Sequence, residues 1–137
     1  MAATIRKADY FSMRVPNRAG TGAGLLAALK AEGVNLLAFS GFPERGGAQV
    51  DFMPENSRKF RAAAKKAGMK LGARKTVFLM RGDDRVGALT AALGKLAAVR
   101  ISIVAIQAVT AGQGRYGAMF WVKPKDVGRA SRVLGAK

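Results

Sequence analysis

The stretch Phe11-Ser12-Met13-Arg14 returns 67 residues later as Phe78-Leu79-Met80-Arg81 (78 minus 11), and this repetition decides the fold. The same spacing relates Val34-Asn35-Leu36 to Ile101-Ser102-Ile103 and Leu29 to Leu96. A chain that repeats itself in this way contains one supersecondary unit used twice. We expect the two copies to pack about a pseudo-twofold axis, and the seam between packed modules is a common place for a ligand site.

The first copy has the pattern strand, helix, strand, strand, helix, strand. Apolar and polar residues alternate as far as Val15, Leu25 and Leu29 lie on one stripe of a helix, and Gly33 ends that helix. The predicted elements are a strand over 4–15, a helix over 21–32, a strand over 34–39, a turn over 41–47, a strand over 48–53, a helix that Asn56 caps and that ends near residue 67, and a short strand over 70–73.

The second copy repeats this order without its last strand. The predicted elements are a strand over 76–80, a loop over 81–85, a helix over 86–98, a strand over 101–109, a turn over 111–114, a strand over 116–122 and a helix over 125–134. By the spacing of Pro54 and Pro124, Lys137 matches Ala67 at the end of a helix. We therefore expect residues 4–8 to supply the missing strand and to leave no unpaired edge there.

Together the two copies predict an α+β protein of two tandem ferredoxin-like βαββαβ repeats, with antiparallel sheets and helices on one face. The repeats are expected to span residues 1–73 and 74–137. Two stretches, 101–106 and 119–122, are apolar on both faces, which is typical of strands that are buried on both sides. Sheet-to-sheet packing in a homodimer would bury them, although the neighbouring repeat could bury part of them instead.

The composition argues against an independent enzyme. The 137 residues include no cysteine and no histidine, so thiol nucleophiles, thiolate metal sites and the commonest general base are absent. The chain has eight acidic residues, and none of them is placed with a nucleophile in a pattern that indicates an active site. We expect no catalytic residue, no metal and no cofactor. No apolar run approaches the roughly 20 residues of a membrane span, no secretory signal is visible, and the lack of cysteine fits the cytoplasm.

The net charge of +16 is large, because a small soluble domain usually carries a net charge of about 2–8. Either the basic residues form a solvated surface, or they attract polyanions and small acids. The stretch Gly-Arg-Tyr-Gly-Ala-Met-Phe-Trp over 114–121 partly matches the third strand of RNA-recognition motifs, but residues 47–52 of the first copy lack the stacking aromatics. RNA binding stays an alternative, and any nucleic-acid binding is expected to be weak, non-specific and salt-sensitive.

The two copies resemble the ACT domain, a small-molecule-sensing module attached to many amino-acid biosynthetic enzymes. The resemblance lies in Asn17-Arg18-Ala19-Gly20, a leucine-rich helix and Gly33-Val34-Asn35-Leu36, and it returns in Asp84-Arg85-Val86-Gly87 and Ile101-Ser102-Ile103. Ala19 and Val86 stand where the family usually has proline, and Ser102 stands where it prefers asparagine. The resemblance implies a regulatory protein that binds an amino acid or related carboxylate, acts through association and has a regulated enzyme as its partner.

The residues themselves favour carboxylate binding at the first loop. Gly20 and Thr21 stand at a predicted helix N-terminus, where free amides point outwards and the helix dipole is positive. Asn35 offers both a donor and an acceptor. The predicted ligand-binding residues are Asn17, Arg18, Ala19, Gly20, Thr21 and Asn35 in the first copy, and Asp84, Arg85, Val86, Gly87 and Ser102 in the second. A ligand-free assembly subunit remains the alternative.

Overall fold

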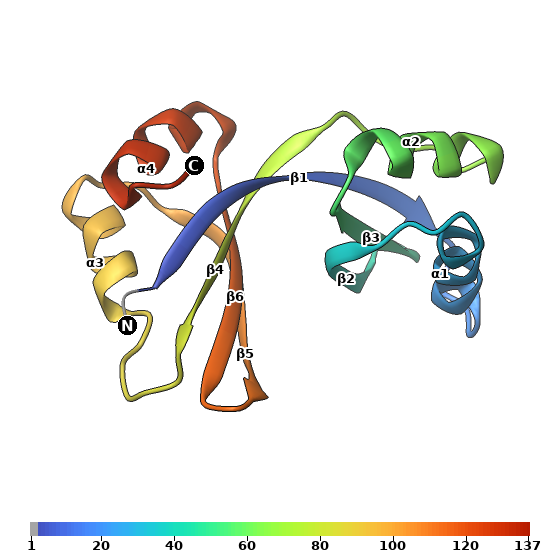
Figure 1. Cartoon of the computed structure of the whole chain (residues 1–137). Helices are drawn as coiled ribbons and strands as arrows, with labels where there is room; N and C mark the ends of the chain where they lie inside the picture. Colours follow the sequence, from blue (N-terminus) through green and yellow to red (C-terminus); the bar gives the residue numbers. More distant parts are fainter. Residues whose placement is uncertain (1–2) are drawn as a thin grey trace. The chain divides into compact units, whose positions relative to one another are not determined.

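The computed structural model describes residues 3–137, which form an α+β fold of six strands, four α-helices and one short 3₁₀ helix (Figure 1). The chain divides into two compact units. The first unit is Asp9–Lys75, and the second is Thr76–Lys137 together with the N-terminal residues 3–8. None of the helices in residues 3–137 is both long enough and apolar enough to span a membrane.

The first unit is a sheet with two helices on one face. Its strands are the C-terminal part of β1 (Thr4–Val15), β2 (Leu36–Glu44) and β3 (Gly47–Pro54), in the order β2-β3-β1, and both pairings are antiparallel. Its helices are α1 (Thr21–Ala31) and α2 (Ser57–Lys66). Because β1 and β2 each run opposite to β3, these two strands run in the same direction.

Aromatic residues fill the core of the first unit. The rings of Phe11 and Phe52 each lie 5.3 Å from that of Phe60, which α2 contributes, and α1 adds the buried Leu29. Edge-to-face and tilted aromatic pairs at this distance stabilise a core beyond the area that they bury. The side chain of Asn56 caps α2 by accepting a hydrogen bond from the Lys59 amide at 3.0 Å, as predicted.

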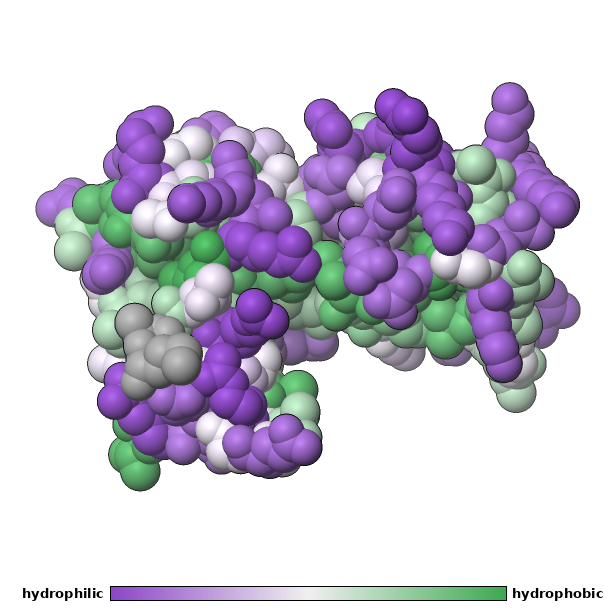
Figure 2. All heavy atoms as spheres, viewed as in Figure 1, coloured by the Kyte–Doolittle hydropathy of each residue, from purple (hydrophilic) through white to green (hydrophobic). Residues whose placement is uncertain are grey.

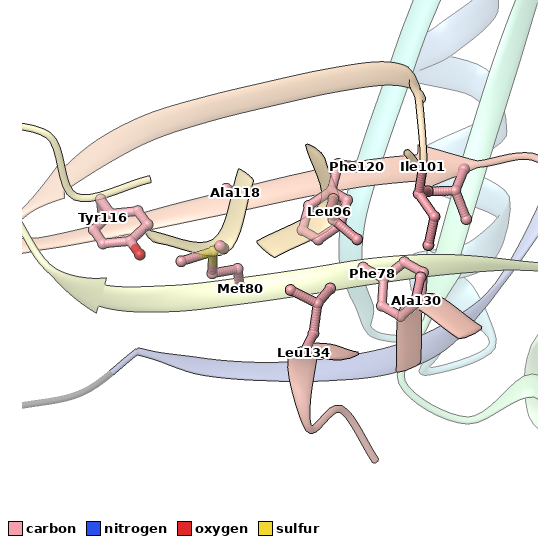
Figure 3. Packing of buried hydrophobic residues seen from close by; sticks show 11 residues of the cluster. Phe78, Met80, Leu96, Ile101, Tyr116, Ala118, Phe120, Ala130 and Leu134 are labelled. Carbon is pink, nitrogen blue, oxygen red and sulfur yellow. The ribbon is translucent and has the colours of Figure 1, made fainter. Parts of the chain in front are cut away.

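The second unit has the same plan. Its strands are the N-terminal part of β1, β4 (Lys75–Asp83), β5 (Ile103–Gly112) and β6 (Arg115–Val122), in the order β1-β4-β6-β5. Its helices are α3 (Thr90–Ala98) and α4 (Val127–Leu134), with a 3₁₀ turn at Pro124–Asp126 before α4. Figure 3 shows the core, in which Phe78 and Phe120 cluster with Leu96 of α3 and Leu134 of α4. The rings of Phe78 and Phe120 stack with their centroids 5.2 Å apart.

The two units pair their strands in equivalent registers. Phe11 lies opposite Phe52 in the first unit, and Phe78 lies opposite Phe120 in the second. The β1 residues map onto β4 with an offset of 67 (78 minus 11), and the β3 residues map onto β6 with an offset of 68 (120 minus 52). By this rule Met13–Val50 corresponds to Met80–Ala118, and Val15–Ala48 corresponds to Gly82–Tyr116.

Three predicted boundaries are wrong at the hairpins and at the second loop. The predicted turn over 41–47 contains only Arg45 and Gly46, both with positive φ, so β2 and β3 continue to the two-residue turn. The same kind of turn, Gln113-Gly114, joins β5 to β6. The strand predicted over 76–80 extends to Asp83, and the helix predicted from Val86 begins only at Thr90, because Gly87 adopts the left-handed conformation at φ 69°.

The short strand predicted over 70–73 does not form. This segment is irregular, and it makes a single backbone contact with β1, in which the Gly72 amide donates to the Ser12 carbonyl at 2.9 Å. Glycine inside a strand weakens it and often marks the close approach of another backbone. The residues therefore follow β1 without forming a regular ladder.

Candidate functional site

A cavity of about 210 Å³ lies in the first unit where the loop after β1 meets the start of α1. The ends of β2 and β3 that lie beside this loop form its opposite wall. It is lined by Val15, Pro16, Asn17, Arg18, Thr21, Gly22, Gly41, Phe42, Pro43, Ala48 and Val50. Because Val15 and Pro43 both pair with Ala48 in the sheet, the cavity lies at the very end of that sheet.

The start of α1 presents backbone donors to this region, although the Thr21 amide already donates to the Arg18 carbonyl at 3.2 Å. Gly20 precedes the helix in the left-handed conformation, and no side chain of residues 3–137 caps the first turn. No acidic residue stands in that turn. The first amides of a helix lack acceptors within the helix and carry partial positive charge, so this end can accept an anion. By contrast, α2 is already capped by Asn56.

The side chains of the cavity divide into two kinds. Arg18, Asn17 and Thr21 supply polar groups beside the helix start, whereas Val15, Phe42 and Val50 supply hydrocarbon from the sheet. No acidic residue lines the cavity. A lining that combines cationic and polar donors with apolar side chains suits a small acid with a hydrocarbon tail.

The nearest hairpin is held in place by an ion pair. The guanidinium of Arg14 lies 2.9 Å from the carboxylate of Glu44, and it also donates to the backbone carbonyls of Glu44 at 2.8 Å and Arg45 at 3.3 Å. Glu44 is therefore occupied by Arg14. The pair fixes the end of β2 that forms the cavity wall.

The structure brings most of the first predicted loop to one place. Asn17, Arg18 and Thr21 line the cavity, and Ala19 and Gly20 complete the loop between them. Asn35 is not among these residues. It precedes β2 at the far end of the sheet, where its side chain donates to Glu55 at 3.4 Å, and at roughly 3.3 Å per residue it lies more than about 20 Å from Pro43.

The second predicted loop has a different form. Asp84, Arg85, Val86 and Gly87 make turns before α3, in which the Asp84 amide donates to the Gly114 carbonyl at 2.8 Å and the side chain of Val86 is fully exposed. Ser102 precedes β5 at the opposite end of the sheet from this loop, since Ile103 pairs with Val122 and Asp83 pairs with Arg115.

At the sheet end of the second unit, a tyrosine takes the place that corresponds to the cavity. Tyr116 corresponds to Ala48 and lies opposite Gly82, which corresponds to Val15. A Cβ atom on Gly82 would lie 2.9 Å from the ring of Tyr116, so the ring packs directly over the glycine. The Tyr116 hydroxyl is buried and has no hydrogen-bond partner among residues 3–137, and burial raises the pKa of this phenol.

The structure does not support the alternative of an RNA-recognition motif, because aromatic residues that would have to stack on bases are buried. Tyr116 and Phe120 of the stretch 114–121 belong to the buried core under α3 and α4 (Figure 3). An RNA-recognition motif needs such aromatics on the open face of its sheet, where bases can stack on them. Among residues 3–137, no cluster of acidic side chains could hold a metal ion either.

No known protein family and no curated protein matches the sequence. Solved structures are similar over nearly the whole chain. A protein from Bacteroides thetaiotaomicron superposes with a TM-score of 0.76 at 19% identity, covering 97% of this chain and 88% of its own. The regulatory subunit of aspartate kinase from Thermus thermophilus, in a ligand-free form, gives a TM-score of 0.66 at 13% identity, covering 98% and 95%.

A third structure, the regulatory subunit of aspartate kinase from Thermus flavus, has a TM-score of 0.60 at 12% identity, covering 98% of this chain and 95% of its own. At such identities the likeness concerns the fold. The chain therefore shares the ACT-like fold of these regulatory subunits, as the sequence resemblance predicted. Function has to be argued from the site.

Proposed function

We propose that this protein is a non-catalytic regulatory protein of the ACT type, built from two tandem ferredoxin-like repeats. In this proposal the cavity of the first unit binds a small carboxylate, and binding changes how the protein associates with a partner. The observation that carries the proposal is the position of the cavity, which joins Arg18, the uncapped start of α1 and an apolar wall in one unit. The strand registers support the tandem repeat, because they are equivalent in the two units.

The proposed mode of binding uses charge and backbone donors together. The carboxylate would accept hydrogen bonds from the first amides of α1 and pair with Arg18, which makes no ion pair with another of residues 3–137. Hydrogen bonds that involve a charged group are stronger than neutral ones. The amino-acid ligand that the resemblance implied is one candidate, and the chemistry of the cavity is common to all small carboxylates.

The ligand proposal is tested by Arg18→Gln, which removes the charge and keeps a polar side chain. A charge-assisted hydrogen bond contributes about 1.5–3 kcal/mol, so the variant should bind a small carboxylate at least about tenfold more weakly. Lys30→Gln is the matched control, because it removes the same charge at the other end of α1. Calorimetric titration that gives equal affinities for wild type and Arg18→Gln would remove Arg18 from the site.

We further propose that association uses β5. This strand lies at the edge of its sheet, carries no charged residue from Ile103 to Gly112, and exposes Val104 and Val109 by 62% and 69%. A long apolar edge strand is a ready template for pairing with another chain. The proposed arrangement is a homodimer, with a regulated enzyme as a further partner. A ligand that favours one arrangement typically shifts such an equilibrium by a factor of about 5–150, which sedimentation with and without ligand would measure.

Basic residues cover other parts of the surface. Figure 2 shows hydrophilic side chains over α2, where Arg58, Lys59, Arg61 and Lys65 are all exposed. None of these four forms an ion pair with another of residues 3–137. Such a field attracts polyanions without reading a sequence. We therefore propose that nucleic acid binds only weakly and non-specifically, and that salt abolishes this binding.

A further inference from the structure

We propose that the cavity of the first unit selects an apolar monocarboxylate that lacks an α-ammonium group, and that it discriminates against the corresponding amino acid. The inference rests on the proposed function, since it names the class of ligand that the same cavity takes. It departs from the amino-acid ligand that the sequence resemblance implied.

An ammonium group would find no carboxylate in this cavity. The lining residues include no aspartate or glutamate. Glu44, at the end of the neighbouring strand, is held by Arg14 at 2.9 Å. Asp51 is buried and accepts hydrogen bonds from Ser12 at 2.7 Å and from Gln49 at 3.0 Å. An ammonium group bound here would therefore gain no ion pair, and Arg18 would repel it.

The net charge of the first unit also favours a carboxylate over an amino acid. Residues 9–75 contain 12 lysines and arginines and 5 acids, which gives a net charge of +7 (12 minus 5). A positive unit attracts an anion but repels the ammonium group of a zwitterion. Arg18 stands in the cavity lining itself, so the repulsion is local as well as general.

The size and the wall of the cavity define the rest of the ligand. Its 210 Å³ is below the roughly 300–1,000 Å³ of sites for drug-sized ligands, so the ligand is small. Val15, Val50 and Phe42 add hydrocarbon to the same lining. A carboxylate with a short branched chain, such as 4-methylpentanoate, would place its charge at the helix start and its methyl groups against these residues.

The test compares compounds that differ by one group. Leucine is 4-methylpentanoate with an α-ammonium group, and 4-methylpentanamide lacks only the negative charge. Calorimetric titration of the whole protein should give the carboxylate an affinity at least about tenfold above that of leucine, the order expected for one unpaired charged group, and should give the amide no measurable binding. Leucine binding as tightly as the carboxylate would overturn this inference and leave the proposed site intact.

A second variant separates the two proposals further. Ala48→Asp places a carboxylate in the cavity lining, and Ala48→Asn is its uncharged control of the same shape. The aspartate should shift the preference towards leucine by at least about tenfold, and the asparagine should not. If the aspartate leaves the ratio of the two affinities unchanged, the missing acid is not the cause of the selection and the inference is wrong. If wild type binds no small carboxylate at all, both the inference and the proposed function fail.

Discussion

The ends of the two sheets differ in a single exchange of large and small residues. In the first unit Val15 lies opposite Ala48, and in the second Gly82 lies opposite Tyr116. The positions are equivalent in register, but the larger side chain is on β1 in the first unit and on β6 in the second. The small Ala48 lines a cavity of about 210 Å³, whereas the ring of Tyr116 packs over Gly82. The difference teaches that one repeat can leave a cavity open at a place that its twin fills with a packed side chain.

The loops beside these sheet ends also differ, and the loop of the first unit is the better suited to an anion. The loop of the first unit leads through Gly20 directly into α1 and contains no acid, whereas the second carries Asp83 and Asp84 and passes through Gly87 before α3 begins. Asp83 is paired with Arg115 at 2.6 Å. Like charges repel, so acidic side chains in the second loop disfavour a bound carboxylate there. The two loops therefore support the assignment of the ligand to the first unit.

The largest expected effect is the loss of stability in Tyr116→Ala. This side chain is only 7% exposed and belongs to the core of the second unit, so its removal should lower the free energy of unfolding by about 3–5 kcal/mol. Phe42→Ala is the control on an exposed ring, with an expected cost below about 1 kcal/mol. Urea denaturation measures both. A cost for Tyr116→Ala no greater than that for Phe42→Ala would contradict the packing difference.

A smaller effect is expected for Gly82→Val, which copies Val15 into the second unit. Its Cβ atom would lie 2.9 Å from the Tyr116 ring, so the variant should lose about 1–3 kcal/mol. The double variant Gly82→Val with Tyr116→Ala recreates the pair of the first unit. It should therefore be more stable than the sum of the two single losses predicts, because the clash disappears with the ring. If the losses in free energy of unfolding are strictly additive in the urea experiment, the side chains at positions 82 and 116 are not coupled and the packing account is wrong.

The smallest effect concerns the hydroxyl of Tyr116. It is buried without a partner among residues 3–137, so Tyr116→Phe should be neutral or stabilising by up to about 1 kcal/mol at neutral pH. Burial raises the pKa of this phenol, so the native state keeps its proton when the unfolded state, with its ordinary pKa near 10, has lost it. Stability is therefore full below pH 10 and falls as the pH rises above it.

This fall should be shallower in Tyr116→Phe than in wild type, when unfolding is measured between pH 8 and 11. Tyr10, whose pKa is raised by burial and by the charge of Asp51, remains in both proteins and cancels in the comparison. Identical pH profiles for the two proteins would show that Tyr116 ionises as easily in the native state as in the unfolded state.

The order of the elements could be predicted from the sequence, but the ends of several elements could not. Periodicity gave β1 its bounds of Thr4 and Val15, and it placed the helices on the right segments. The hairpin of the first unit is longer than predicted, because the pair Gly46-Gly47 indicated a bend and the turn was extended back to residue 41. In the structure Gly41 and Pro43 lie in β2, an edge strand, where proline is tolerated.

The position of the first loop could be predicted from the sequence, whereas the grouping of the site residues could be predicted only in part. Glycine and polar residues before a helix indicate a helix N-terminus, and α1 does begin at Thr21. Asn35 was grouped with them, although β1 and β2 run in the same direction and therefore begin at the same end of the sheet. The distance of Asn35 from the loop follows from topology alone, because a strand-helix-strand crossover gives parallel strands. The contribution of Ala48 could not be foreseen, because it depends on which residue lies opposite Val15.

The most direct test of the account transfers the packing of the second unit into the first. The variant Val15→Gly with Ala48→Tyr places a glycine and a tyrosine in the register that Gly82 and Tyr116 occupy. Calorimetric titration with 4-methylpentanoate should show binding by wild type and a loss of at least about tenfold in the double variant, while circular dichroism shows a folded protein. Equal affinity in the folded double variant would contradict the central claim, because the ligand would then bind somewhere other than this cavity.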